Sequence, residues 1–251
     1  MQISDNTILI TGGSSGIGRA LAEALHQRGN RVIITGRQQR QLDEITARHP
    51  GITGLLLDLG QPDTLPQLAE QVRTRFPQLN VLIANAGISR AEDMTADHWN
   101  MADAEAIIAT NILGVLRVTA AFLPQLKTRP QATLMATSSA LAFVPLAAFP
   151  SYCASKAFLH SWLLSLRHQL RKTSVEVLEL LPPYVQTKLT GAQQSTDPRA
   201  MPLADYVAQV LHMLEHGEHA RGELLLPRDL PRRHAERDGS FDAMFAAMNP
   251  T

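Results

Sequence analysis

Short apolar runs alternate with segments of helical spacing along most of the chain. Residues 7–10 are apolar and end at Thr11-Gly12-Gly13, after which Ile17, Leu21 and Leu25 lie on one helical stripe. This alternation predicts an α/β fold, a doubly wound parallel sheet of about seven strands with helices on both faces. The strand candidates are residues 7–10, 32–35, 55–57, 81–84, 133–137, 175–180 and 223–226. The helical candidates are one segment from residue 17, one around residues 42–45, and residues 63–75, 100–122, 151–171 and 202–215.

Composition narrows the class of partner. The 251 residues suffice for one substantial core, and 45% hydrophobic with 18% charged residues is ordinary for a globular protein. Lys plus Arg and Asp plus Glu each total 23, so no overall charge draws the chain to nucleic acid or to an anionic membrane. We therefore expect a small-molecule partner and no nucleic acid.

The same sequence favours a cytoplasmic location. The single cysteine, Cys153, excludes an internal disulfide framework, and the first residues lack the basic and apolar regions of a signal peptide. The longest apolar stretches fall short of the ~18 residues that indicate a membrane span. We expect no membrane-spanning segment.

The first strand candidate leads into a glycine-rich loop. Gly12, Gly16 and Gly18 follow that strand and open a helix. Glycine lets the backbone approach a ligand closely, and a helix amino terminus offers unpaired N–H groups to a pyrophosphate. A glycine turn used only for packing is the alternative, which the flanking strand and helix disfavour. The loop residues expected at a dinucleotide are Gly12, Ser14, Ser15, Gly16, Ile17 and Gly18.

The end of the second strand candidate bears on the choice of dinucleotide. An acidic residue there binds the ribose 2′-hydroxyl of NAD, but this chain has Thr35-Gly36-Arg37. The planar cation of Arg37 suits a 2′-phosphate. The sequence thus predicts NADP(H) in preference to NAD(H), the alternative being that Arg37 is an ordinary solvated arginine.

Tyr152 and Lys156 stand at positions i and i+4 of a predicted helix, and Ser139 ends the strand before it. Such positions share a helix face, so the ammonium can lie near the phenol and make its deprotonation easier. Taken singly, a tyrosine, a surface lysine and a strand-ending serine are commonplace. Together, behind a glycine loop, they predict proton transfer at a carbonyl or alcohol oxygen, with Tyr152 as acid or base and Ser139 as hydrogen-bond donor.

From Thr7 to Leu226 the chain resembles the short-chain dehydrogenase/reductase family. Residues 11–18 are similar to its T-G-x-x-x-G-x-G loop and residues 84–87 to its N-N-A-G strand end. Residues 142–145 and 181–187 resemble a subgroup named after an oxidoreductase of the D-alanyl-teichoic-acid gene cluster. The resemblance implies a single-domain Rossmann fold and a catalytic tetrad of Asn111, Ser139, Tyr152 and Lys156. It further implies cofactor contacts from Asp58 at the adenine and from Leu59, Asn85, Ala86, Gly87, Tyr152, Lys156, Val185 and Thr187.

Two positions depart from the family pattern. Ala84 replaces the first asparagine of N-N-A-G, and Pro183 replaces the glycine of the usual P-G after the sixth strand. Neither belongs to the tetrad. Because proline stiffens the chain and removes a backbone donor, Pro183 bears on the contacts implied for Val185 and Thr187.

The carboxyl-terminal region reads as an appendage. We expect a dinucleotide-binding domain over residues 1–226, containing the active site, and a tail over residues 227–251 that docks on the body or on a second subunit. The polar stretch 191–199 reads as a mobile loop. The resemblance implies a homodimer or homotetramer formed through the helices of Asn111 and Tyr152.

Two other groups of residues invite a functional reading. His212 and His216 are i and i+4 in a predicted helix, but His219 follows a glycine and no cysteine or carboxylate set completes a metal site. We predict no metal. Cys153 borders Tyr152, yet without a histidine at a recognised spacing it reads as a packing residue.

Three functions remain open at this level. The leading one is an NADP(H)-dependent carbonyl reductase or alcohol dehydrogenase acting on an apolar ketone, aldehyde or secondary alcohol, because residues 141–146 suggest an apolar wall. A catalytically silent NADP-binding sensor is the second, since a fold and a cofactor loop do not prove catalysis. An epimerase or dehydratase that retains its cofactor is the third.

Overall fold

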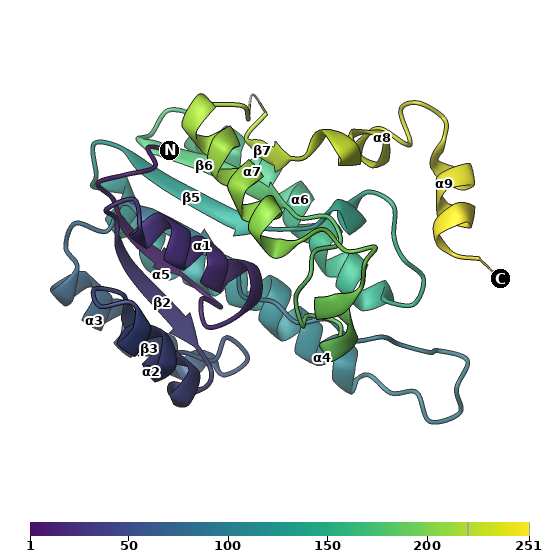
Figure 1. Cartoon of the computed structure of the whole chain (residues 1–251), viewed down its shortest axis with the longest axis horizontal. Helices are drawn as coiled ribbons and strands as arrows, with labels where there is room; N and C mark the ends of the chain where they lie inside the picture. Colours follow the sequence, from purple (N-terminus) through teal and green to yellow (C-terminus); the bar gives the residue numbers. More distant parts are fainter. Residues whose placement is uncertain (220, 251) are drawn as a thin grey trace.

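A computed structural model of the chain describes residues 1–219 and 221–250 (Figure 1). It contains one seven-stranded sheet in which every pairing is parallel. Three of the strands, at residues 7–10, 81–84 and 132–137, are buried along their whole length, which explains their apolar sequences. The strands are β1 (Thr7–Ile10), β2 (Arg31–Gly36), β3 (Thr53–Leu56), β4 (Val81–Ala84), β5 (Ala132–Thr137), β6 (Val175–Leu181) and β7 (Glu223–Leu225).

The strand order is β3-β2-β1-β4-β5-β6-β7. Strand β1 lies between β2 and β4, with Ile8 paired to Val32 on one side and to Val81 on the other. The chain therefore winds outward from β1 in one direction and returns at β4 to wind in the other. In such sheets ligands bind outside the carboxyl ends of the strands where the winding reverses.

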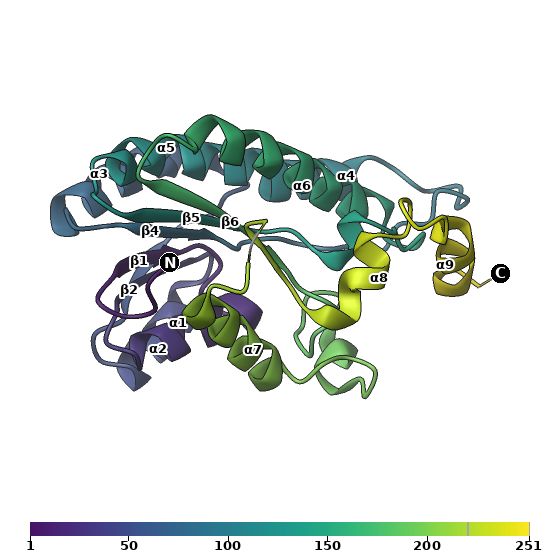
Figure 2. The ribbon, with the colours of Figure 1, turned by 90° about the horizontal axis from the view of Figure 1, so that it is seen from above.

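Helices cover both faces of the sheet, as Figure 2 shows. One face carries α1, α2 and α7, and the other carries α3, α5 and α6, each packed on its own hydrophobic cluster. Figure 2 also shows that α4 continues into the second layer. The helices are α1 (Gly16–His26), α2 (Gln39–Arg48), α3 (Leu65–Arg75), α4 (Ala102–Ile107), α5 (Gly114–Lys127), α6 (Pro150–Leu170), α7 (Leu203–His216), α8 (Leu230–Arg233) and α9 (Phe241–Met248).

The predicted α/β fold with a doubly wound parallel sheet is confirmed, and two segments differ in detail. The helix expected over residues 100–122 is interrupted by a π-helix at Ile108–Leu113. The expected mobile loop over residues 191–199 instead contains a 3₁₀-helix at Ala192–Thr196. There the buried Gln194 amide donates to the Val185 carbonyl at 2.8 Å, a side-chain contact that a polar composition does not announce.

The stretch Ala102–Lys127 is the one helical segment, within the described residues, that is long and apolar enough to cross a membrane. In this fold it is one of the helices that cover the sheet, with Val115, Val118 and Phe122 in the hydrophobic core. Burial against the sheet accounts for its apolar composition.

The chain beyond β7 runs along one end of the molecule, through α8 and out to α9 (Figures 1 and 2). No residue of α9 is buried. Asn249, which follows α9, accepts a hydrogen bond from the Ala147 amide at 2.6 Å and donates to the Pro145 carbonyl at 3.2 Å. The tail is thereby tied to the loop between β5 and α6.

Candidate active site

The glycine loop joins β1 to α1 at the point where the winding of the sheet reverses. Gly12 has φ +66°, and a Cβ at this position would lie 2.8 Å from the Ala86 backbone. A Cβ at Gly18 would lie 2.5 Å from the Gly12 carbonyl oxygen. Only glycine satisfies both positions, so the loop closes tightly against the end of β4.

Thr11 fixes the loop to the segment after β4. Its hydroxyl accepts hydrogen bonds from the amides of Asn85 at 3.0 Å and Ala86 at 3.1 Å. The Asn85 side chain in turn donates to the Thr11 carbonyl at 3.2 Å. These bonds bring three of the predicted cofactor residues, Gly12, Asn85 and Ala86, to one place.

The start of α1 presents free backbone donors beside this loop. Ser15 caps the helix with extended backbone and without a side-chain hydrogen bond, and the first turn carries no acidic residue. The partial positive charge of the helix amino terminus is thus uncompensated by its own first turn. Ser14 packs against Gly36, the last residue of β2, so Arg37 follows directly after the strand beside this loop.

Arg37 and Asp58 differ in whether they form ion pairs or hydrogen bonds with other residues of the protein. Arg37 is exposed and has no ion pair among residues 1–219 and 221–250. Asp58 accepts a hydrogen bond from the Gly60 amide at 2.9 Å, which leaves its second carboxylate oxygen available. Leu59 is buried, so it can offer a ligand only its backbone.

Tyr152, Ser139 and Lys156 converge beside the carboxyl ends of β4 and β5. Ser139 is 6% exposed and Tyr152 7%, so both sit just beneath the surface. The Lys156 ammonium donates to the Thr137 carbonyl at 2.8 Å and lies 5.6 Å from the centre of the Tyr152 ring. The predicted i, i+4 face of the helix is therefore the face that meets the sheet.

Burial governs the charges of this pair. Desolvation raises the pKa of Tyr152 to about 12, and a hydrogen bond from Ser139 acts in the opposite direction. Desolvation likewise lowers the pKa of Lys156 to about 8, partly opposed by the charge of Glu179. Without a bound nicotinamide, loss of water around the phenolate is the largest influence on the pKa of Tyr152, and it acts against the lowering expected from Lys156.

Asn111 lies in the π-helix and is completely buried. Its side chain accepts from the Ile88 amide at 2.9 Å and donates to the Ile88 carbonyl and to the Ser155 hydroxyl, each at 3.0 Å. A Cβ on Gly87 would lie 3.3 Å from Asn111 and 3.5 Å from the Lys156 ammonium. Gly87 therefore lies between Asn111 and Lys156, two members of the predicted tetrad.

The segment after β6 approaches the glycine loop from the other side. The Thr187 side chain is the nearest group to Gly16, within ordinary contact distance of a Cβ built there. Val185 is 2% exposed, and its carbonyl already accepts the Gln194 amide. The Thr187 side chain therefore faces the glycine loop, where a ligand would bind. The Val185 carbonyl is already partly satisfied by the hydrogen bond from Gln194.

The apolar wall expected from residues 141–146 is only partly available. Val144 is completely buried and belongs to the interior. Leu141, Pro145 and Leu146 are half-buried. Phe143 packs against the His160 ring on one side and the Arg233 guanidinium on the other.

The histidines near α7 do not converge within the part of the chain that the structure describes. The rings of His212 and His216 stack at 4.1 Å, and His216 bonds to the His212 carbonyl. His219 lies by Glu176 instead, at 3.8 Å. Cys153 is buried with its thiol directed at the Leu146 carbonyl, as a packing residue would be.

Sequence reasoning missed a polar group next to the tetrad. The Ser138 hydroxyl donates to the carboxylate of Glu179, and His160 bonds to the same carboxylate. One available signal was the spacing of Tyr152, Lys156 and His160, each one turn from the next on one helix face. Another was a glutamate inside the apolar run of β6.

Comparison with known proteins agrees with this arrangement. Residues 6–198 match the profile of the short chain dehydrogenase family. The chain is 39% identical, over 99% of its length and 98% of the relative's, to the uncharacterized oxidoreductase DltE of Bacillus subtilis. It is 34% identical to an uncharacterized oxidoreductase of Myxococcus xanthus, with 82% of each chain covered.

Solved structures share the fold over the full chain. A short chain dehydrogenase from Burkholderia cenocepacia in complex with NADP has a TM-score of 0.81 at 26% identity, with 100% of both chains covered. With the family match over most of the length and a relative of this identity over nearly all of it, the chain belongs to the short-chain dehydrogenase/reductase family of oxidoreductases.

Proposed function

We propose that the protein is an NADP(H)-dependent carbonyl reductase or alcohol dehydrogenase that acts on an apolar ketone, aldehyde or secondary alcohol. The observation that carries the proposal is the convergence of Tyr152, Ser139 and Lys156 beside the glycine loop. A hydroxyl donor, a phenol and an ammonium at the reversal point of a parallel sheet are what transfer of a proton to a carbonyl oxygen requires.

The residues fit a nicotinamide dinucleotide. The tight turn at Gly12 and Gly18 leaves a space that a side chain would fill. This space lies at the start of α1, where the Ser15 side chain makes no capping hydrogen bond. Backbone donors at such a site bind a pyrophosphate. Arg37 stands beside the loop without an ion pair among the described residues, as a partner for a 2′-phosphate would. The short chain dehydrogenase from Burkholderia cenocepacia, in complex with NADP, supports a nicotinamide dinucleotide at this site.

The protein's own residues supply the proton. When bound, the reduced nicotinamide supplies hydride to the carbonyl carbon. Because the pKa of Tyr152 is about 12, its phenol keeps its proton at neutral pH and can donate it to the carbonyl oxygen. The Ser139 hydroxyl donates to the same oxygen, and the Lys156 ammonium offsets the negative charge that Tyr152 acquires. In the oxidative direction, the positive charge of the oxidised nicotinamide favours the phenolate.

The proposal is tested by following NADPH absorbance with a panel of apolar ketones and aldehydes. We expect net NADPH consumption by the wild-type protein and a loss of about 10²- to 10⁴-fold in kcat for Tyr152→Phe, because the proton donor is removed. The variant should keep its affinity for NADPH in a fluorescence titration. Tyr184→Phe, at an exposed tyrosine, serves as the control. Tight NADPH binding by wild type with no consumption across the panel would support a silent sensor instead.

Cofactor preference is tested at Arg37. Arg37→Asp replaces a cation for the 2′-phosphate by a repelling carboxylate, so we expect the KM for NADPH to rise about 10- to 100-fold. The KM for NADH should change little. Arg48→Asp, at an exposed arginine in the last turn of α2, makes the same charge change away from the loop. Equal effects of Arg37→Asp on both cofactors would remove the argument for NADP.

We also propose a cytoplasmic homodimer or homotetramer. Large apolar side chains are exposed on the helices that carry the tetrad, among them Ile108, Leu113, Phe158 and Leu164. Sedimentation of the purified protein measures the assembly state directly.

A further inference from the structure

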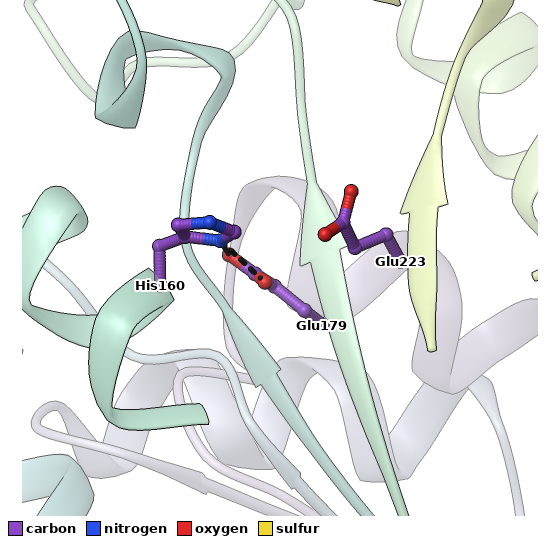
Figure 3. A group of neighbouring side chains, drawn as sticks. All are labelled: His160, Glu179 and Glu223. Carbon is purple, nitrogen blue, oxygen red and sulfur yellow. Dashed lines mark hydrogen bonds and ion pairs between the residues drawn. The ribbon is translucent and has the colours of Figure 1, made fainter. Parts of the chain in front are cut away.

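A carboxylate is buried directly behind the candidate active site. Glu179 on β6 is 0% exposed and pairs in register with Ala136 of β5. Its oxygens accept a hydrogen bond from the Ser138 hydroxyl and lie 2.9 and 3.1 Å from Nδ1 of His160 (Figure 3). Because a carboxylate only accepts, the His160 ring must carry its hydrogen on Nδ1.

A second carboxylate completes the cluster. Figure 3 shows Glu223 of β7 beside Glu179 and His160. One nitrogen or oxygen atom from each of the three side chains lies within 4.8 Å of the other two. Arg233 holds Glu223 through two hydrogen bonds of 3.0 and 3.1 Å. The guanidinium already supplies the positive charge that a metal ion would bring. The cluster is therefore balanced by the protein's own cations.

Glu179 is costly where it stands. A buried carboxylate loses its hydration, and its strand neighbours Leu178 and Leu180 are both completely buried and apolar. His160 and Ser138 recover part of that cost by hydrogen bonding. Glu179 is also close to Lys156 along the chain of contacts. The Lys156 ammonium donates to the Thr137 carbonyl, and the next residue, Ser138, donates to Glu179.

The geometry of α6 links the two charges. Tyr152, Lys156 and His160 follow one another at single turns along the helix face that meets the sheet. His160 contacts Glu179 directly, and the negative charge of Glu179 favours the protonated form of Lys156. The other ionisable groups around this cluster are Tyr152 and Arg167 on α6, Glu223 on β7 and Arg233 on α8. The neutral Ser138 comes from the residue directly after β5.

We propose that Glu179, fixed by His160 and Ser138, is a positioning residue that keeps the buried Lys156 in its ammonium form beside Tyr152. The role in catalysis rests on the proposed reductase function. Glu179 acts through Lys156 and does not itself meet the substrate. Removing its negative charge makes proton loss from the Tyr152 and Lys156 pair easier, whichever of the two releases the proton.

The charge effect can be measured without turnover. With ε-¹³C-labelled lysine, the NMR titration of Lys156 is assigned by comparison with Lys156→Met. We expect a midpoint near the pKa of about 8 in wild type and one lower by on the order of one unit in Glu179→Gln. Glu176→Gln removes a carboxylate from the same strand, where it pairs with the terminal amine of Met1, and should leave the midpoint unchanged. An unchanged midpoint in Glu179→Gln would overturn the proposal.

Activity provides the second readout. In carbonyl reduction with saturating NADPH, the fall of kcat at high pH should begin about one pH unit lower in Glu179→Gln than in wild type. A uniform loss of rate at every pH, with the same midpoint, would make Glu179 merely structural. If wild type consumes no NADPH, the proposed function fails while the NMR titration still decides the role of Glu179.

A second substitution at Glu179 and a test for metal binding complete the experiment. If Glu179→Gln does not fold, Glu179→Leu removes the same charge with an apolar side chain of similar size, a change that buried ionic groups often tolerate. The same downward shift of the Lys156 midpoint is expected. A melting temperature raised by Zn²⁺ in wild type but not in Glu179→Gln would identify the cluster as a metal site and overturn the proposal.

Discussion

The Lys156 side chain is 3% exposed, and its ammonium has one hydrogen bond, to the Thr137 carbonyl. Most of the hydration that an ammonium enjoys in the unfolded chain is thereby lost. The folded protein holds its proton with a pKa of about 8, against about 10.4 for a free lysine. The residue that the site needs charged is thus one that folding tends to neutralise.

This shift has a consequence for stability. Between about pH 8 and pH 10 the unfolded chain keeps the Lys156 proton while the folded protein releases it, so the free energy of unfolding should rise with pH. Lys156→Met abolishes the effect. We expect wild type to gain up to about 3 kcal/mol relative to Lys156→Met over this range, measured by urea unfolding at pH 7 to 10 without cofactor.

The control is Lys172→Met, at an exposed lysine beyond α6. It should track wild type at every pH. Because the raised pKa of Tyr152 opposes the trend only above about pH 10, that residue does not mask the result. A constant difference between wild type and Lys156→Met across the range would show that Lys156 is not desolvated in solution.

At the scale of single residues, the sequence predicts which groups meet but not their charge states. The i, i+4 spacing brings Tyr152 and Lys156 to one helix face, as expected. The direction of the phenol pKa depends on how much water surrounds the group, and spacing carries no information on that. The sequence does not reveal the role of Glu179 because its partners, Ser138 after β5 and His160 on α6, are far away in sequence.

Among the elements, the tail helix α9 contributes no residue to either hydrophobic cluster. It buries no residue, and Asn249 ties its end to the loop between β5 and α6. Asn249→Ala removes both hydrogen bonds. We expect amide hydrogen exchange at Ala147 to quicken by about 10-fold, since the lost bonds contribute on the order of 1 kcal/mol, with little change in global stability.

Asp242→Ala, an exposed change on α9 itself, provides the comparison. It should leave the exchange rate of the Ala147 amide as in wild type. Equal protection of that amide in Asn249→Ala and wild type would show that other contacts hold the loop. A raised KM for the carbonyl substrate in Asn249→Ala would connect the tail to the proposed reaction.

The π-helix illustrates where element prediction stops. Apolar spacing over residues 100–122 predicts a helix, and a helix is present on both sides of Ile108–Leu113. The widened turn places Asn111 against Ile88 and Ser155. Because Ile88 and Ser155 belong to other segments, the local sequence pattern does not predict the change from α-helix to π-helix.

At the scale of the whole molecule, the class of fold follows from the alternation of apolar runs and helices. The strand bounds agree with the predicted ones to within about two residues, as in β1 and β4, where they coincide. The order of the strands does not follow from that pattern. It is set by which helix faces are buried together. The sequence does not predict the substrate, because the side chains of residues 141–146, the expected apolar wall, are only partly exposed.

The position of β1 also shapes how the chain reaches this structure. Within residues 1–219 and 221–250, no strand pairs with its neighbour through a hairpin. The central pairing of Ile8 with Val81 joins segments far apart in sequence. Such contacts slow folding, because closing a large loop costs conformational entropy before the contact contributes any stabilising free energy. During synthesis, β1 has one edge open until β4 has been made, and its apolar side chains can meet other nascent chains. The glycine loop and the Tyr152 helix, which lie on opposite sides of that pairing, become one site only when it forms.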